Sequence, residues 1–364
     1  MKDIYESLRQ HFNEGSMVKL RKTKELMQIL KILFTPEQAE VALAIPLPAG
    51  GRISIKNLAK ELGSAPEAVE DKVEALAREG KARIMTSRRD GEKYAVLWPV
   101  FPGMLEAVYA DGIDNDQRRR LSRLTEKYYF EDGAWNEFAS SKYPISRVIP
   151  INKSIENASN VLPFENVTRF IEESETISII PCLCRAVAKN CDHILEADIV
   201  FGPWAEYLIK YRGARKWDKT EALQRLKECE EDGLVHLTGN TQDGSLFICN
   251  CCPCCCKPLR GLIELHNPRS FVRSNFLPRI DHEKCNLCAT CKKICPMGAV
   301  SRLPGIEADQ SDAMMLIQDI RCIGCGLCAS HCPVHAVEMI KVRNRIPVET
   351  LTEGNNQYIK EKAW

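Results

Sequence analysis

Cysteine is missing from the first 181 residues of this 364-residue chain: the 18 cysteines all lie between Cys182 and Cys332. The chain also lacks an excess of charge of one sign. Its formal net charge of +1 excludes a general attraction to polyanions, so a nucleic-acid site would need a local basic patch. No apolar run approaches the ~18 residues of a transmembrane helix, and the N-terminal stretch lacks the apolar core of a signal peptide. We therefore expect a cytoplasmic protein without a transmembrane segment.

Several cofactor motifs are missing as well. We find no G-x-G-x-x-G after a predicted strand, no phosphate-binding P-loop and no C-x3-C-x2-C radical-initiating motif. The chain therefore offers no recognisable substrate or nucleotide pocket, and we assign no catalytic residue.

The cysteines that are present indicate metal binding. In a reducing cytosol, a high density of thiols favours metal ligation over disulfides. The chain has only 7 histidines, and thiolate sites with few histidines favour iron–sulfur clusters or zinc.

The strongest motif occurs twice. Residues 285–296 read CNLCATCKKICP and residues 322–333 read CIGCGLCASHCP, both of the form C-x2-C-x2-C-x3-C-P. Each continues to a matching Ala-Val pair, at 299–300 and at 336–337. This is an internal duplication of the two-cluster ferredoxin motif, in which the fourth cysteine of each run ligates the other cluster.

The duplication predicts two 4Fe-4S clusters with four cysteines each. The first set is Cys285, Cys288, Cys291 and Cys332, and the second is Cys322, Cys325, Cys328 and Cys295. Zinc sites use paired C-x2-C units with longer gaps between the pairs, so this spacing argues against zinc. Residues 280–341 resemble bacterial ferredoxins throughout, except for a 26-residue linker between the motifs that contains the polar segment 307–312.

Nine further thiols are candidates for additional clusters. Six fill eight positions of ICNCCPCCCK, and three precede them: Cys182, Cys184, Cys191, Cys249, Cys251, Cys252, Cys254, Cys255 and Cys256. Neighbouring cysteines in extended backbone point to opposite sides, so this run could serve two centres. We expect an extended Cys182-Leu183-Cys184 to join Cys191 and one thiol of the run in a further 4Fe-4S cluster, with zinc as the alternative. Cys229 falls on a predicted helix over 219–232 and is interpreted as a buried packing residue.

The N-terminal region has its own pattern of elements. Helical spacing over 17–34, a second helix from residue 35, and helices over 53–63 and 64–80 precede a hairpin around Asp90-Gly91. This order resembles a winged helix-turn-helix domain. The overall prediction is an α+β protein with these parts: a winged-helix-like domain at 1–100, a connector at 101–175, a cysteine-rich α/β domain at 176–272, a two-cluster ferredoxin domain at 273–342 and a tail at 343–364.

The whole layout resembles a group of multidomain 4Fe-4S proteins of anaerobic bacteria and archaea. That resemblance implies a cytoplasmic protein that relays low-potential electrons for larger redox enzymes through at least two 4Fe-4S clusters and one or two more. We expect an electron-transfer component of an oxidoreductase complex in preference to a catalytic subunit. The basic residues that flank the motifs could offset cluster charge, dock an acidic partner or form a solvated face: Lys284, Lys292, Lys293 and Arg321.

Two alternative functions are weighed against electron transfer. The first is a redox-responsive winged-helix transcription regulator. The presumed recognition helix opposes it, because it carries five acidic residues against two basic ones and would be repelled by phosphates. The wing residues Arg88, Arg89 and Lys93 are the feature in favour of DNA, and protein docking is the interpretation we prefer. The second alternative, a catalytic iron with an open position at the nine-cysteine site, lacks a recognisable acid or base.

Overall fold

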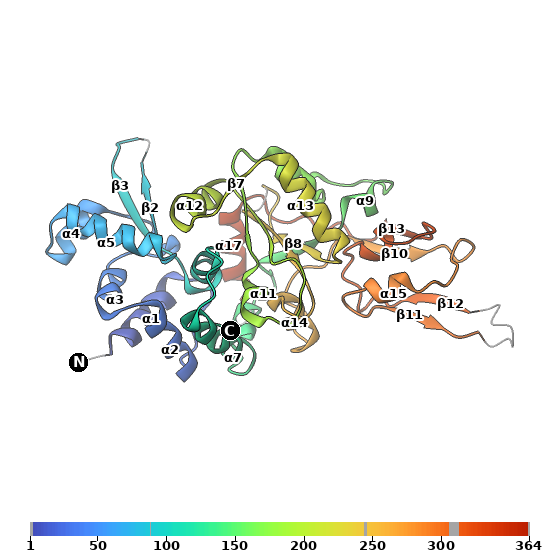
Figure 1. Cartoon of the computed structure of the whole chain (residues 1–364), viewed down its shortest axis with the longest axis horizontal. Helices are drawn as coiled ribbons and strands as arrows, with labels where there is room; N and C mark the ends of the chain where they lie inside the picture. Colours follow the sequence, from blue (N-terminus) through green and yellow to red (C-terminus); the bar gives the residue numbers. More distant parts are fainter. Residues whose placement is uncertain (1–2, 88, 244–245, 306–312, 363–364) are drawn as a thin grey trace. The chain divides into compact units, whose positions relative to one another are not determined.

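A computed structural model describes residues 3–87, 89–243, 246–305 and 313–362. The chain forms two compact units (Figure 1). Unit 1 contains residues 1–138, 180–190 and 204–216, and unit 2 contains residues 139–179, 191–203 and 217–364. Residues 307–312 of the ferredoxin linker and Arg88 of the presumed wing lie outside the described residues.

Unit 1 is mostly helical. Its helices are α1 (Ile4–Gly15), α2 (Lys24–Leu33), α3 (Pro36–Leu43), α4 (Ile55–Leu62), α5 (Pro66–Arg78), α6 (Leu105–Tyr109), α7 (Asp116–Phe130), α8 (Ala134–Phe138), α11 (Leu183–Ala188) and most of α12 (Gly202–Arg212). A 3-10 turn lies at Pro48–Gly50 and an irregular turn at Val100–Met104. Strands β1 (Ile53–Ser54), β2 (Ala82–Thr86) and β3 (Lys93–Leu97) form an antiparallel sheet in the order β1-β3-β2.

Local sequence explains the N-terminal helices. Thr35 and Gln38 form a reciprocal capping box at α3, with the Gln38 amide donating to Thr35 Oγ1 at 3.2 Å and proline in the first turn. In α5 the apolar positions Val69, Val73 and Leu76 share one buried face. The predicted helices and the hairpin are therefore present, and β1 closes the hairpin into a three-stranded sheet.

Unit 2 is built around a six-stranded sheet of order β4-β8-β9-β6-β5-β7. The strands are β4 (Ser146–Ile149), β5 (Ile177–Pro181), β6 (Glu196–Phe201), β7 (Lys216–Trp217), β8 (Val235–Gly239) and β9 (Phe247–Cys251). Three neighbouring pairs in this sheet are antiparallel: β4 with β8, β8 with β9, and β9 with β6. Short and medium helices accompany the sheet: α9 (Asn152–Ile155), a 3-10 turn at Pro163–Glu165, α10 (Val167–Glu173), α13 (Lys219–Glu231) and α14 (Lys257–Ile263).

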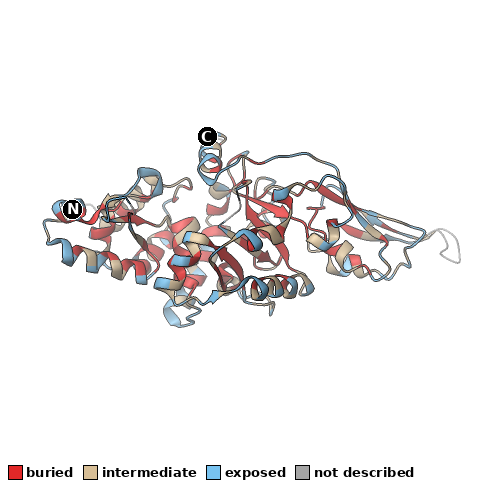
Figure 2. Cartoon of the chain, turned by 90° about the horizontal axis from the view of Figure 1, so that it is seen from above, coloured by how far each residue is buried: buried red, intermediate tan, exposed pale blue. Residues whose placement is uncertain are grey.

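The two faces of this sheet have different cores. Helices α10 and α13 pack on one face, where Ile248 of β9 joins Val167, Ile199 and Leu226. On the other face, Cys251 of β9 joins a second core with Leu259 of α14 and with residues of the ferredoxin motifs. Successive side chains of a strand point to opposite faces, so β9 sends Ile248 to one core and its cysteines to the other. Figure 2 shows buried residues on both the helices and the strands of the chain.

The C-terminal part of unit 2 repeats one arrangement twice. Strand β10 (Phe276–Ile280) pairs antiparallel with β13 (Val337–Lys341), and β11 (Val300–Leu303) pairs antiparallel with β12 (Met314–Ile317). Short helices α15 (Thr290–Ile294) and α16 (Leu327–Ser330) lie within the two cysteine runs and carry Cys291 and Cys328. The expected tail contains a further helix, α17 (Leu351–Lys360), which begins with a Thr350/Glu353 capping box.

No helix in the described ranges is long and apolar enough to cross a membrane.

Candidate iron–sulfur sites

The two C-x2-C-x2-C runs form two loops with the same backbone conformation. In the first run, Leu287 and Ala289 both adopt left-handed backbone, each with φ of 59°. The equivalent positions of the second run are Gly324 and Gly326, with φ of 71° and 84°. Alternation of left-handed residues with ordinary ones turns consecutive backbone amides towards a common anion, as in an anion-binding nest. The repeated sequence is therefore a repeated backbone cradle.

The first predicted cysteine set comes together in space. Cys285, Cys288, Cys291 and Cys332 line one cavity, closed by apolar side chains such as Ile280 and Met315. Three of these thiols come from the first run, and Cys332 comes from the second. Cys288 is exposed, whereas Cys291 and Cys332 are buried. Hydrogen bonds with Thr290 lower the pKa of the exposed Cys288 thiol.

The second predicted set is more deeply enclosed. Cys322, Cys325 and Cys328 are all buried, and Cys295 is half-buried. Burial raises the pKa of Cys325 to about 12, and the neighbouring thiols Cys322 and Cys295 add to the shift. Burial likewise raises the pKa of Cys328 well above its ordinary value, with Cys325, Cys322 and Cys295 contributing. Four thiolates this close repel one another, so the group favours ionisation only when positive iron is bound.

The Ala residues that follow the two motifs contact the fourth cysteines. The backbone N–H of Ala299 donates to Cys295 Sγ at 3.2 Å, and the N–H of Ala336 donates to Cys332 Sγ at 3.2 Å. Amide hydrogen bonds to ligating sulfur disperse negative charge and tune cluster potential. Together, the thiolate donors, the amide cradles and the crossed fourth ligands fit two 4Fe-4S clusters.

The cysteine run at 249–256 divides into two thiol groups. Cys249 and Cys251 are two residues apart on β9 and share a face, and Cys256 is the N-cap of α14. Hydrogen bonds with the thiols of Cys249 and Cys256, followed by burial, raise the pKa of Cys251 well above its ordinary value. We call Cys249, Cys251 and Cys256 the strand thiols.

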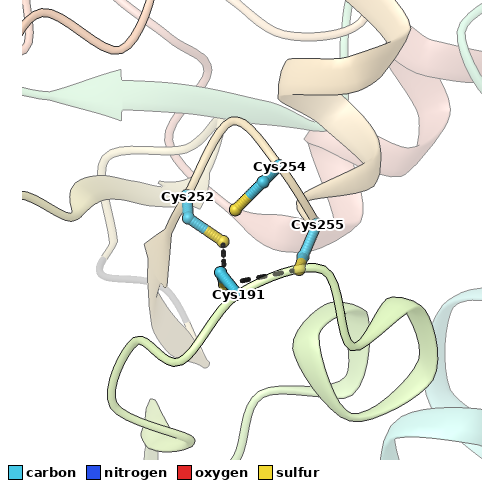
Figure 3. A group of neighbouring side chains, drawn as sticks. All are labelled: Cys191, Cys252, Cys254 and Cys255. Atoms are coloured by element: carbon cyan, nitrogen blue, oxygen red, sulfur yellow. Dashed lines mark hydrogen bonds between the residues drawn. The ribbon is translucent and has the colours of Figure 1, made fainter.

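The other thiols of the run gather around Cys191. The Sγ atoms of Cys191, Cys252, Cys254 and Cys255 all lie within 4.8 Å of one another (Figure 3). Cys191 Sγ is 3.7 Å from Cys252 Sγ and 3.6 Å from Cys255 Sγ. Burial raises the pKa of Cys254 to about 12, and Cys191 and Cys252 contribute. We call these four residues the turn thiols. The run thus contributes thiols to two groups. We expected Cys191 to lie near one thiol of the run, whereas the structure places it near three.

Cys182 and Cys184 do not lie on an extended segment, which corrects the sequence-based expectation. Strand β5 ends at Pro181, Cys182 is the N-cap of α11, and Cys184 lies in the first turn of that helix. Residues two apart on a helix face different directions, so this spacing does not align the thiols as a strand would. Both residues belong to unit 1, whereas Cys191 belongs to unit 2. Cys229 lies on α13 with no exposed surface, in agreement with a packing residue.

The basic residues around the ferredoxin motifs differ in their contacts. Lys284 forms an ion pair with Asp281 at 2.9 Å, and this partner raises the pKa of Lys284. Lys292 and Lys293 are exposed on α15. Arg321 is exposed beside Gly298, directly before Cys322. Lys292 and Lys293 are therefore the cations of this set that the fold presents on the ligand-bearing helix.

Sequence reasoning missed a polar network behind the strand thiols. Asn250 lies between Cys249 and Cys251 on the opposite face of β9 and has no exposed surface. Its side chain donates to the Ala197 carbonyl at 2.6 Å and contacts His236 Nδ1 at 2.6 Å, while His236 Nε2 is 3.1 Å from Glu230. The alternation of cysteine with asparagine in the strand was the available signal. This network fixes the strand that carries two thiols.

Comparison with protein families supports the assignment of the C-terminal region. Residues 284–336 match the family model of the 4Fe-4S dicluster domain. No solved structure matches the chain.

Three curated relatives are similar over short stretches. The pyruvate synthase subunit PorD of Methanothermobacter marburgensis is 36% identical over 64 residues, which are 18% of this chain and 65% of that subunit. PorD of Methanocaldococcus jannaschii is 35% identical over 66 residues, 18% of this chain and 69% of the subunit. An uncharacterized ferredoxin of M. jannaschii is 38% identical over 110 residues, 28% of this chain and 63% of the ferredoxin. The chain thus spans slightly less than two thirds of two of these relatives and slightly more of the third.

Proposed function

Because this chain belongs to the ferredoxin-type 4Fe-4S proteins and has an iron–sulfur electron-transfer role, we propose that it relays low-potential electrons between redox proteins. Two clusters are held by the crossed cysteine sets of the ferredoxin motifs, Cys285 with its partners and Cys322 with its partners. When bound, such a cluster accepts and releases one electron at a potential set by charge, hydrogen bonds to sulfur and solvent exposure.

The observation that carries this proposal is that thiols of neighbouring groups lie in shared apolar clusters, so that the groups follow one another through unit 2. Cys291 of the first set and Cys328 of the second lie in one apolar cluster, with Cys285 and Cys295 packed against it. Cys322 and Cys325 of the second set lie in another apolar cluster together with Cys251 and Cys256. The succession begins at the exposed Cys288 and ends at the strand thiols, of which Cys251 and Cys256 are buried and Cys249 is half-buried. These apolar side chains exclude water between successive groups and keep the donors in fixed positions.

We further propose that the strand thiols supply ligands to an additional cluster. They share a hydrophobic core with Cys322 and Cys325, so a redox centre there would continue the succession into the six-stranded sheet. Lys257 is buried directly after Cys256, and a cation in that position suits an anionic thiolate cluster. Cys182 and Cys184 stay candidate ligands of an additional centre.

The exposed end is the proposed docking site for a partner. Cys288 is the exposed thiol of the first set, and Lys292 and Lys293 lie on the helix of the same motif. Two adjacent exposed lysines favour an acidic patch on the partner and accelerate its association at low salt. Since PorD is a pyruvate synthase subunit, an oxidoreductase is the class of partner we propose.

We propose that the winged-helix-like region of unit 1 docks protein and does not read DNA. The wing residue Lys93 forms an ion pair with Glu70 of α5, so this cation is neutralised by the acidic helix beside it. Lys56 of α4 pairs with Glu92 at 3.1 Å. These pairs reduce the positive charge that a phosphate backbone would need.

Iron and acid-labile sulfide analysis of the anaerobically purified chain, with EPR of the reduced protein, tests the function. We expect at least eight irons and eight sulfides per chain from the two ferredoxin sets, with spectra of interacting reduced 4Fe-4S clusters. Cys288→Ser and Cys325→Ser should each remove or alter one of the two signals. Clearly fewer than eight sulfides per chain after full reconstitution would contradict the two-cluster proposal.

A further inference from the structure

The turn thiols form a site that electron relay does not require. They come from two segments of unit 2: Cys191 from the loop before β6, and Cys252, Cys254 and Cys255 from the turn between β9 and α14. Figure 3 shows the four side chains pointing towards a common centre. Their Sγ atoms lie within 4.8 Å of one another, with two separations of 3.6 and 3.7 Å from Cys191.

These separations discriminate between kinds of metal centre. Four thiolates that bind one tetrahedral zinc at 2.3 Å are separated from each other by about 3.8 Å. In a cubane each thiolate binds a different iron at an outer corner, which separates the four terminal sulfurs by roughly 6 Å. The turn thiols match the single-ion separation.

The ferredoxin motifs provide an internal comparison. Their eight cysteines fall into the two expected sets, yet none of them joins a ligand group as tight as the turn thiols anywhere in the described residues. Among the described residues, the turn thiols are thus a compact set, whereas the two ferredoxin sets and the strand thiols are not.

The backbone holds the compact set in place from both sides. The Cys256 amide donates to the Cys252 carbonyl at 3.0 Å and closes the turn that presents three of the thiols. The loop that follows Cys191 is anchored to the end of α13, because Asp232 accepts from the Ile194 amide at 3.0 Å and contacts His193 at 3.0 Å. Ligands fixed by such contacts lose little freedom when a metal binds.

The donor set also indicates a closed site. Four thiolates complete the tetrahedral coordination of zinc, and Cys252 and Cys255 are buried. A closed tetrathiolate site leaves no position for water or substrate, which is typical of structural zinc and unlike a catalytic centre.

We propose that Cys191, Cys252, Cys254 and Cys255 bind a single tetrahedral metal ion of the structural zinc type. The ion ties the turn between β9 and α14 to the loop before β6. It thereby fixes the neighbouring strand thiols without carrying electrons itself. This goes beyond the proposed relay, which would stand whatever occupies this site.

Metal and sulfide analysis of full-length protein tests the proposal with adjacent pairs of cysteines. Cys252→Ser and Cys255→Ser should each lose about one zinc per chain and leave acid-labile sulfide unchanged. The sequence neighbours Cys251→Ser and Cys256→Ser should retain that zinc, because their thiols belong to the other group. Cys229→Ser, a buried thiol on α13, is the control for loss of a cysteine without loss of a ligand.

A measurement on the unmodified protein covers variants that fail to fold. X-ray absorption at the zinc edge should give four sulfur neighbours at about 2.3 Å. A sulfide-free single iron in the same four-sulfur environment would equally support a single-ion site. Loss of four irons and four sulfides from Cys255→Ser, or a protein with neither zinc nor a single sulfur-bound iron, would overturn it.

Discussion

Gly324→Ala tests the packing of the second cysteine loop most directly. An added Cβ would lie 2.1 Å from the Phe276 carbonyl oxygen and 2.2 Å from Ser274 Oγ. The Phe276 carbonyl belongs to β10, which pairs along its length with β13, so it cannot move aside cheaply. Ser274 Oγ is also engaged, because it donates to the Gly324 carbonyl at 2.7 Å. The substitution therefore forces a backbone shift at the centre of a C-x2-C-x2-C cradle.

Two contributions give the expected loss of stability in Gly324→Ala. Left-handed backbone costs a residue with a Cβ about 1–2 kcal/mol, and overpacking of a well-packed site costs about 1–3 kcal/mol. The sum is about 2–5 kcal/mol, which for a unit of this size lowers the melting temperature by roughly 5–15 °C. The equivalent position of the first loop is Leu287, which tolerates a side chain at φ of 59°. The larger contribution is therefore specific to the surroundings of the second loop.

The assay is thermal loss of visible absorbance under anaerobic conditions, at one scan rate because loss of bound iron is irreversible. Gly298→Ala is the matched control. It also has positive φ, of 55°, but its Cβ would meet only the end of the Arg321 side chain, at 3.3 Å. The melting temperature of the control should fall by only a few degrees, because the control has only the cost of left-handed backbone. Equal shifts for the two variants would refute the packing argument.

Three further predictions concern surfaces and charge. Lys292→Glu combined with Lys293→Glu should slow electron transfer to an acidic partner by about tenfold at low salt, an effect that disappears at high salt in stopped-flow traces. The protein should bind duplex DNA weakly and without sequence preference. Sequence-specific binding that persists at about 0.2 M salt, where phosphate contacts are already weakened, would favour the transcription regulator over electron transfer. The Arg9 guanidinium lowers the pKa of Glu6 to about 2, so this carboxylate stabilises unit 1 above the unfolded value near 4.5 and loses the effect as the pH falls towards 2. The difference in melting temperature between the parent protein and Glu6→Gln, followed by circular dichroism, should accordingly narrow below pH 4.5.

Short-range sequence signals anticipated much of the secondary structure. The Thr35 capping box, the apolar face of α5 and the hairpin around Asp90-Gly91 depend on residues close in the chain, and all three are present. The prediction of an extended Cys182-Leu183-Cys184 segment is wrong, and the reason is also local. Pro181 ends β5, and the following residues begin a helix at Leu183 that the cysteine spacing did not announce.

The ferredoxin motifs predict the division of their thiols into two sets from the sequence alone. A fixed spacing of two residues shapes each loop, and the duplication requires the fourth cysteine to cross to the other set. The same is not true of the run at 249–256. Its membership in two groups depends on which face of β9 meets which core, and on the turn that follows Cys251.

Sequence alone thus indicated iron–sulfur chemistry and the kinds of local element, and it predicted two crossed sets of four cysteines, because these depend on residue type and short spacing. Only the tertiary structure decided that Cys191 joins Cys252, Cys254 and Cys255, and that the strand thiols share a core with the second ferredoxin set. Such contacts join residues about sixty to seventy positions apart. They are set by the packing of strands and loops that no periodicity in the sequence encodes.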